Sequence, residues 1–310
     1  MIPRTLLRIL GWCLALGLIG ASLWFLRGQL PEIRRVASDV HPRWSLVALA
    51  SLVVLATYAL LIETWRGVLN ALGGRLERAP AAIVWLGSGL ARYLPGVGWQ
   101  IGVMTLMTKR RDVPVAISAT TSIIITVTNL ITGLVVFSVA SATMPAVRGF
   151  RVWLVLAGVA ALAAAPFVLS RLAAITKRVS GRDLVIPTIS LRPVILSIVG
   201  TAVSWIMYGI AFWILTQSIF PDPSRSVAGC IALYTGAYMT GLLAIVPPAG
   251  LGVADVAMIE LAARLGLFGR PEAVILAGVV RIWRTVLEIV PGVVTLGVTS
   301  LLERARDAKA

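Results

Sequence analysis

The clearest sign of the fold is the run WSLVALASLVVLATYALLIETW, residues 44–65, whose only charged residue is Glu63. An α-helix rises about 1.5 Å per residue, so this run is about 33 Å long as a helix. That length crosses the roughly 30 Å of hydrocarbon in a bilayer. We therefore expect a transmembrane helix here.

The rest of the chain has the same apolar character. Hydrophobic residues make up 58% of the 310 residues and charged residues 13%, and the mean hydropathy is +0.93. Soluble domains carry roughly 25% charged residues, so this chain holds more apolar residues than one soluble core can bury. The composition predicts an all-α, polytopic integral membrane helix bundle that forms a single domain over residues 1–310.

The net charge of +15 fits membrane topology better than nucleic-acid binding. The sequence has no lysine-rich tail, no basic helix with interleaved aromatics and no zinc motif, so we predict no nucleic-acid partner. Cytoplasmic loops of membrane proteins are enriched in lysine and arginine, which also attract anionic headgroups. Placing most of these residues inside predicts cytoplasmic N- and C-termini in the bacterial inner membrane.

Six apolar runs are long enough to span the bilayer. The first could instead be a secretory signal, but its apolar core exceeds the usual 7 to 15 residues. The expected spans are about 5–26, 44–65, 113–142, 152–169, 194–219 and 272–302.

Two further apolar regions, about 80–108 and about 227–265, are interrupted by proline and glycine. Their halves are mostly too short to cross, so each region predicts a re-entrant helical hairpin. The residues expected at the two tips are Pro95, Gly96 and Gly98 in the first hairpin and Pro248, Gly250 and Gly252 in the second.

Paired interruptions that face opposite sides are typical of an inverted pseudo-repeat with its site near the midplane. The residues around the two tips align with Gly96 on Gly250 and Gly98 on Gly252. The alternative is that glycine and proline are simply common in membrane helices. If the hairpins are real, tight turns at these glycines are expected to need positive φ.

Charged residues interrupt the last expected span at Arg281, Arg284 and Glu288. Their i, i+3 and i+7 spacing places them on one helix face. Charges inside a membrane usually face the bundle interior, pair with one another and mark a substrate path. The surplus positive charge suits a phosphate. We expect Asp255 to be a further partner and Arg92 to lie near the first tip; a purely structural ion-pair network is the alternative.

Other side chains offer little for catalysis or metal binding. His41 is the single histidine, and Cys13 and Cys230 have neither metal-ligand nor redox spacing. The sequence therefore predicts no enzyme activity, no metal site and no cofactor. We expect the pair Glu63 and Arg66 to be structural, and Tyr93 to be an interfacial or packing aromatic.

Several of these segments together resemble a known family, the flippase-like transmembrane region of lysylphosphatidylglycerol synthases. The resemblance rests on residues 64–66, 71–73, 89–96 and 248–255, and on the spacing from Arg281 to Gly292. It spans nearly the whole chain. Two departures are Ile125 and Thr126, where the family often has an acidic and a basic residue, and Asp255, where glutamate is usual.

The resemblance implies lipid translocation. With no aminoacyl-transferase domain within these 310 residues, we expect no lipid synthesis. The leading hypothesis is a flippase for an anionic or zwitterionic phospholipid or a polyprenyl-phosphate-type lipid. The first alternative is a non-transporting partner that presents a lipid to a separate glycosyl- or acyltransferase; the second is a membrane-embedded transferase. A second copy of the chain or a lipid-modifying enzyme is a further candidate partner.

Overall fold

The computed structural model of the chain describes residues 41–94, 98–142, 144, 149, 152–153, 156–160, 163–164, 191–244, 250 and 252–307. Throughout these residues the regular secondary structure is helical. The expected span 5–26, most of 152–169 and the tip residues Pro95, Gly96 and Pro248 lie outside the described residues.

Three of the described helices are apolar and long enough to cross a membrane. They are α3 (Trp44–Ala71), α6 (Val115–Ser141) and α8 (Leu191–Ile219). They confirm helices at the spans expected at 44–65, 113–142 and 194–219. Helix α3 continues past residue 65 to Ala71, and Arg66 forms an ion pair with Glu63 one turn earlier on the same helix.

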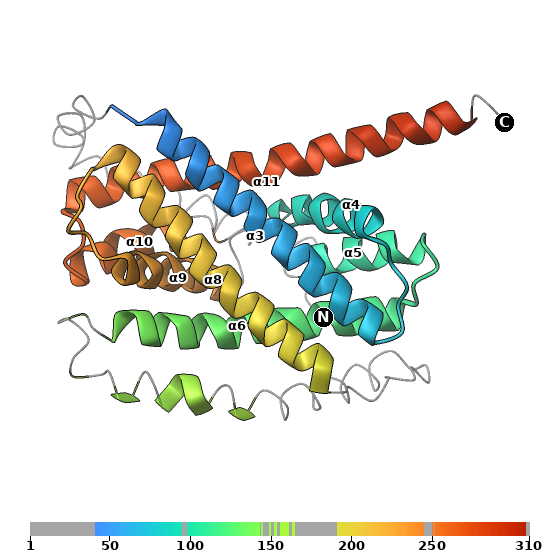
Figure 1. Ribbon diagram of the computed structural model, residues 1–310, viewed down its shortest axis with the longest axis horizontal. Coiled ribbons are helices and arrows are strands. Elements are labelled where there is room, and N and C mark those ends of the chain that lie inside the picture. The colour runs from blue at the N-terminus through green and yellow to red at the C-terminus, as the bar shows by residue number, and fades with distance from the viewer. Residues whose placement is uncertain are drawn as a thin grey trace, which may run out of the picture.

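Helices α3 and α8 lie side by side and run in opposite directions (Figure 1). The N–H of Arg43, just before α3, donates to the carbonyl of Ser218 near the end of α8 at 3.0 Å. Gly200 of α8 packs against Thr64 of α3, where a Cβ would collide with the threonine side chain. Small residues at such contacts let membrane helices approach closely.

Two pairs of shorter helices lie at opposite ends of the bundle (Figure 1). The first pair, with a 3-10 turn between its helices, is α4 (Arg78–Gly89), η1 (Leu90–Tyr93) and α5 (Trp99–Lys109). The second pair is α9 (Val227–Leu243) and α10 (Val253–Arg264). Both regions are therefore interrupted helices, as the sequence predicts. Their insertion from opposite faces of the membrane stays a prediction.

The last helix, α11 (Arg270–Asp307), contacts both pairs. It leaves the second pair and runs along the molecule past the first (Figure 1). Its Gly292 packs closely on α4, where a Cβ would lie 3.0 Å from the carbonyl oxygen of Leu86. This helix, like α6, which contacts α5 and α9, ties the two ends together through a continuous backbone.

Buried apolar side chains of the described residues form two clusters. One gathers residues of α8, α9, α10 and α11 around Phe212, Leu233 and Leu276. The other gathers residues of α3, α4, α5 and α6 around Trp65, Leu69 and Ile124. Each helical pair thus has its own apolar cluster.

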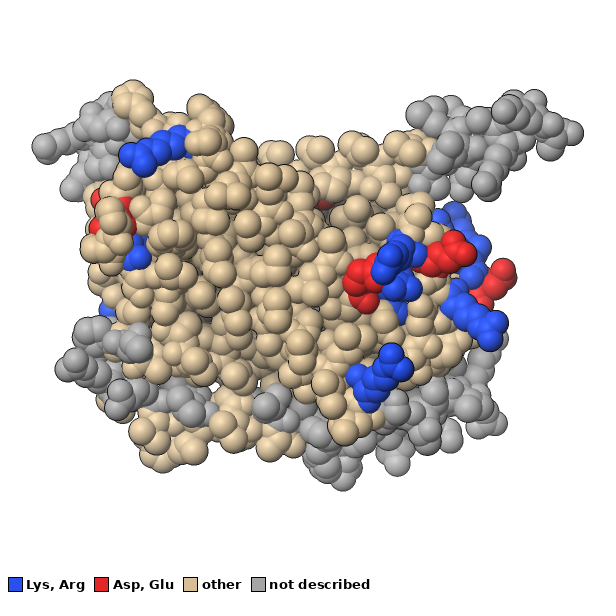
Figure 2. All heavy atoms as spheres, viewed as in Figure 1, with Lys and Arg blue, Asp and Glu red and all other residues tan. Residues whose placement is uncertain are grey.

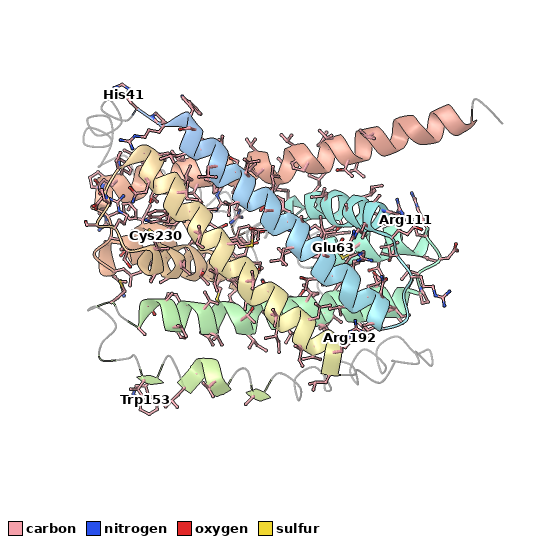
Figure 3. The ribbon with its side chains drawn as sticks, in the orientation of Figure 1. His41, Glu63, Arg111, Trp153, Arg192 and Cys230 are labelled. Atoms are coloured by element: carbon pink, nitrogen blue, oxygen red, sulfur yellow. The ribbon has the colours of Figure 1, made fainter. Side chains whose placement is uncertain are left out.

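Charged side chains on the visible face gather at the two ends of the long axis (Figure 2). The broad band between them is almost free of charge, as expected of a surface that faces lipid. Arg111 and Arg192 lie towards one end and His41 at the other (Figure 3). The grouping agrees with the expected loop sides, while the choice of the cytoplasmic side stays a prediction.

Candidate functional site

The charged face of α11 forms the centre of a polar cluster. Arg284 and Glu288 lie one turn apart, with Arg284 Nε 3.2 Å from Glu288 Oε1. Both are largely buried, with side-chain exposures of 14% and 9%. Arg281 lies one turn before Arg284 and contacts the second helical pair. The cluster is defined here as Arg92, Asp255, Arg281, Arg284 and Glu288.

Arg281 forms a bidentate ion pair with Asp255 of α10. Its Nε and Nη2 donate to Asp255 Oδ1 and Oδ2 at 3.0 and 2.8 Å. Asp255 also accepts the backbone N–H of Gly252 at 3.2 Å, which caps the start of α10. Asp255, which the sequence suggests as a further partner of the arginines, thus forms an ion pair with Arg281 and joins α11 to the second tip.

Glu288 makes the corresponding link to the first helical pair. Its Oε1 accepts a bond from Arg92 Nη1 at 3.1 Å, and its Oε2 accepts one from Tyr93 Oη at 2.7 Å. Arg92 also donates through Nη2 to Gln100 Oε1 at 3.4 Å. Its Nε is buried and has no hydrogen-bond partner among the described residues.

Tyrosines surround this cluster. Four of the five tyrosines of the chain, Tyr58, Tyr208, Tyr234 and Tyr238, form a series of ring contacts with centroids 5.8 to 6.3 Å apart, and the fifth, Tyr93, bonds to Glu288. The guanidinium of Arg284 lies over the Tyr238 ring, 4.7 Å from its centroid. Such stacking stabilises a guanidinium away from water.

A small pocket opens beside the arginines. Its lining consists of Tyr234, Ala237, Tyr238, Ala254, Asp255, Met258, Val280, Arg281 and Arg284. It has room for about one water molecule. Any ligand larger than water therefore needs the surrounding helices to separate before it can enter.

The three tip glycines that the structure describes adopt the backbone conformation expected of them. Gly98, Gly250 and Gly252 have φ of 90°, 66° and 79°. At Gly250 an added Cβ would also lie 2.7 Å from the carbonyl oxygen of Gly241 in α9. At Gly98 an added Cβ would meet nothing within 4 Å.

Some contacts of the cluster are not evident from the sequence. Tyr93, which the sequence suggests as a packing aromatic, donates a hydrogen bond to Glu288. No sequence pattern indicates Gln100 or the ring of Tyr238, although Tyr234 and Tyr238 share a face of α9 at i, i+4 spacing. For Tyr234 and Tyr238, the sequence signal is a hydroxyl group repeated on one face of an otherwise apolar helix.

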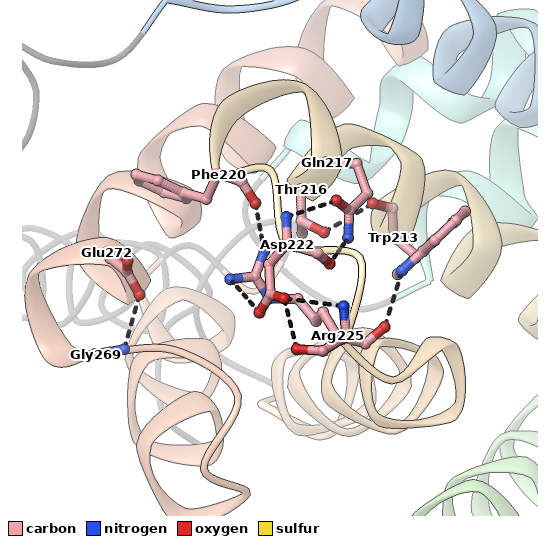
Figure 4. A network of polar contacts seen from close by, with 9 residues as sticks. Trp213, Thr216, Gln217, Phe220, Asp222, Arg225, Gly269 and Glu272 are labelled. Carbon is pink, nitrogen blue, oxygen red and sulfur yellow. Dashed lines mark hydrogen bonds and ion pairs between the residues drawn. The ribbon is translucent and has the colours of Figure 1, made fainter.

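Two other polar networks lie away from the cluster. Glu63 accepts from Arg66 at 2.7 Å and lies 3.3 Å from Arg78 Nε, which agrees with the structural role expected for the pair. At the end of α8, the side chain of Gln217 donates to and accepts from the backbone of Asp222 in the following loop (Figure 4). Hydrogen bonds from the side chain and backbone of Ser224 hold the pKa of Asp222 below its usual value. These networks fix the ends of helices.

Metal binding finds no support in the described residues, which contain no group of three or more histidine, cysteine, aspartate or glutamate side chains able to hold an ion. The cluster itself offers ion pairs and hydrogen bonds. Guanidinium groups bind carboxylates and phosphates well because their planar forks match two oxygens at once.

The apolar helices and the buried charges define an integral membrane protein with an internal cluster of ion pairs. More narrowly, the chain belongs to the family described as the lysylphosphatidylglycerol synthase TM region, whose sequence profile matches residues 9–292. This membership confirms the resemblance noted from the sequence. No curated protein matches the chain.

Proposed function

We propose that this protein moves a lipid with a phosphate-bearing headgroup across the bacterial inner membrane, without chemical change to the lipid. The observation that carries the proposal is the charge of the cluster. Three guanidinium groups face two carboxylates among helices α10 and α11 and the turn η1. A surplus positive charge inside a helix bundle is unfavourable unless an anion shares the site.

The proposed substrates are anionic or zwitterionic phospholipids or lipids of the polyprenyl-phosphate type. In this scheme the two helical pairs are re-entrant hairpins, and the cluster lies between their tips near the midplane. Membership of a family named for a lipid-synthase membrane region supports a lipid as the substrate. Because the pocket holds about one water molecule, transport requires the tips to separate.

The direct test is reconstitution of the purified protein into liposomes with headgroup-labelled phosphatidylglycerol. A membrane-impermeant quencher reports the share of label in the outer leaflet. We expect wild-type protein to make all of the label accessible, whereas protein-free liposomes protect the inner leaflet. Arg284→Ala should slow the movement at least about tenfold, and Arg284→Lys should recover only part, because lysine lacks the planar fork.

Glu63→Gln is the matched control, since it removes a carboxylate from an ion pair outside the cluster. It should transport as wild type does. Equal rates with and without wild-type protein would reject translocation. Lipid binding without movement would instead favour the alternative, a partner that presents lipid to a separate transferase; the small pocket is the observation consistent with that role.

The proposed topology is tested by single cysteines in a background in which Cys13 and Cys230 are replaced by alanine. Ser224→Cys, in the loop before α9, should react with an impermeant maleimide added outside the cell. Arg110→Cys, after α5, should react only after permeabilisation. The reverse pattern would invert the orientation and place both termini outside.

A further inference from the structure

Glu288 occupies a ready-made anion site. Three donors from two elements converge on its carboxylate: Arg92 Nη1 at 3.1 Å, Tyr93 Oη at 2.7 Å and Arg284 Nε at 3.2 Å. The side chain is 9% exposed. Charge-assisted donors at these distances are the arrangement that binds carboxylate or phosphate oxygens in proteins.

The donor set offers more than a carboxylate uses. Arg92 Nε is buried beside these contacts without a hydrogen-bond partner among the described residues. A buried donor left without an acceptor is unfavourable by about 1 to 3 kcal/mol. A carboxylate has two oxygens, whereas a phosphodiester has two charged oxygens and two ester oxygens, and an ester oxygen can accept a weaker bond from an additional donor.

Asp255 differs from Glu288 in how it is held. Asp255 accepts the N–H of Gly252 at the start of its own helix, so its position is fixed by the backbone. The contacts of Glu288 given above are all with side chains. Glu288 can therefore leave its place by a rotamer change, while Asp255 stays with Arg281.

We propose that Glu288 is an internal substitute for the headgroup phosphate, an inference that rests on the proposed function. An incoming phosphodiester displaces the Glu288 carboxylate from Arg92, Tyr93 and Arg284. Its single negative charge offsets the surplus positive charge of the cluster. The exchange replaces the direct link between η1 and α11 by one that runs through the phosphate, so the first helical pair is held by the ligand, while the Asp255–Arg281 pair keeps the second in place.

If Glu288 occupies the site, the ligand binds only to the fraction of molecules in which Glu288 has left it. The apparent affinity is then the intrinsic affinity multiplied by that fraction. Removing the occupant should therefore tighten binding. We expect Glu288→Ala to bind phosphatidylglycerol in mixed micelles about tenfold more tightly than wild type. Glu288→Gln should shift the affinity in the same direction by less, and it covers the case in which Glu288→Ala fails to fold.

Three comparisons make the test specific. Dioleoylglycerol, which lacks the phosphate, should bind all variants equally. Glu63→Gln, which removes a carboxylate outside the cluster, should bind phosphatidylglycerol as wild type does. Tyr93→Phe added to Glu288→Ala changes no charge but removes one donor, so it should reverse part of the gain. A gain that Tyr93→Phe leaves untouched would reflect overall charge and would overturn the proposal.

A parallel titration with inorganic phosphate distinguishes a lipid headgroup from free phosphate as the ligand. A gain with phosphatidylglycerol alone assigns the site to a lipid headgroup, and a gain with both probes assigns it to phosphate groups generally. No gain with either probe in both variants rejects the internal substitute. If wild-type protein moves lipid in liposomes yet neither variant gains affinity, only this inference fails. If the variants gain affinity and wild type moves no lipid, the proposed transport fails instead.

Discussion

The first and second helical pairs meet α11 through ion pairs of opposite polarity. The first pair contributes the cation, Arg92, to a carboxylate on α11. The second contributes the carboxylate, Asp255, to an arginine on α11. The two contacts lie two helical turns apart on α11, between Arg281 and Glu288. One helix therefore links both interrupted segments.

The two links differ in redundancy. Asp255 and Arg281 form a bidentate pair that is joined to the backbone at Gly252 and, at 3.5 Å, at Gly250. Glu288 divides its carboxylate among three side chains. Loss of one partner at Glu288 leaves two others, whereas Asp255 depends on Arg281 for its charge partner. The second link is thus the firmer and the first the more adjustable.

The second tip is also more tightly packed than the first. Substitution of its glycine should give the largest loss of stability. Gly250→Ala places a Cβ 2.7 Å from the carbonyl oxygen of Gly241, and the backbone there cannot yield without moving α9. We expect a loss of about 3 kcal/mol or more. Gly98→Ala meets no neighbour within 4 Å and should lose about 1 kcal/mol from positive φ alone. Thermal unfolding in detergent measures both, and equal losses would refute the difference between the tips.

The next largest effect is expected at the firmer link. Arg281→Ala leaves Asp255 without its charge partner and should destabilise the protein by about 3 kcal/mol. Adding Asp255→Asn removes the unpaired charge while its side-chain oxygen can still accept from Gly252. The double variant should therefore unfold within about 1 kcal/mol of wild type. A double variant no more stable than Arg281→Ala would show that the pair does not act as a unit.

Much of this arrangement is predictable from the sequence. The length and apolarity of residues 44–65 alone predict α3, and the proline and glycine interruptions predict the two short pairs. The spacing of Arg281, Arg284 and Glu288 predicts a shared face, and the loss of stability from an unpaired charge predicts a partner such as Asp255.

The cross-links to the first pair are harder to predict. Arg92 and Glu288 are 196 residues apart, and no periodicity within one helix reports on contacts between distant helices. Tyr93 suggests a packing aromatic because most of its surface is apolar, and its hydroxyl gains importance only when a carboxylate is placed beside it. Tertiary packing, and not local propensity, selects these partners.

A smaller effect is expected at the adjustable link. Arg92→Ala removes one of three partners of Glu288, which keeps Arg284 and Tyr93. We expect a loss of about 2 kcal/mol, below that of Arg281→Ala. Thermal unfolding of the two variants side by side gives the order. A loss at Arg92 that exceeds the loss at Arg281 would make the first link the firmer one.

The smallest effect is expected from Tyr93→Phe, which removes a hydroxyl without changing charge or ring packing. Hydrogen bonds to charged groups contribute about 1.5 to 3 kcal/mol, but Glu288 keeps both arginines, so we expect a loss of about 1 kcal/mol. If the hydroxyl of Tyr93 stabilises the protein through Glu288, the effects of substituting these two residues should not be additive. In a Glu288→Ala background the hydroxyl has lost its acceptor, and Tyr93→Phe should change the stability by less than about 0.5 kcal/mol. Equal losses in the two backgrounds would mean that the hydroxyl stabilises the fold through other groups, and the first link would then rest on the arginines alone.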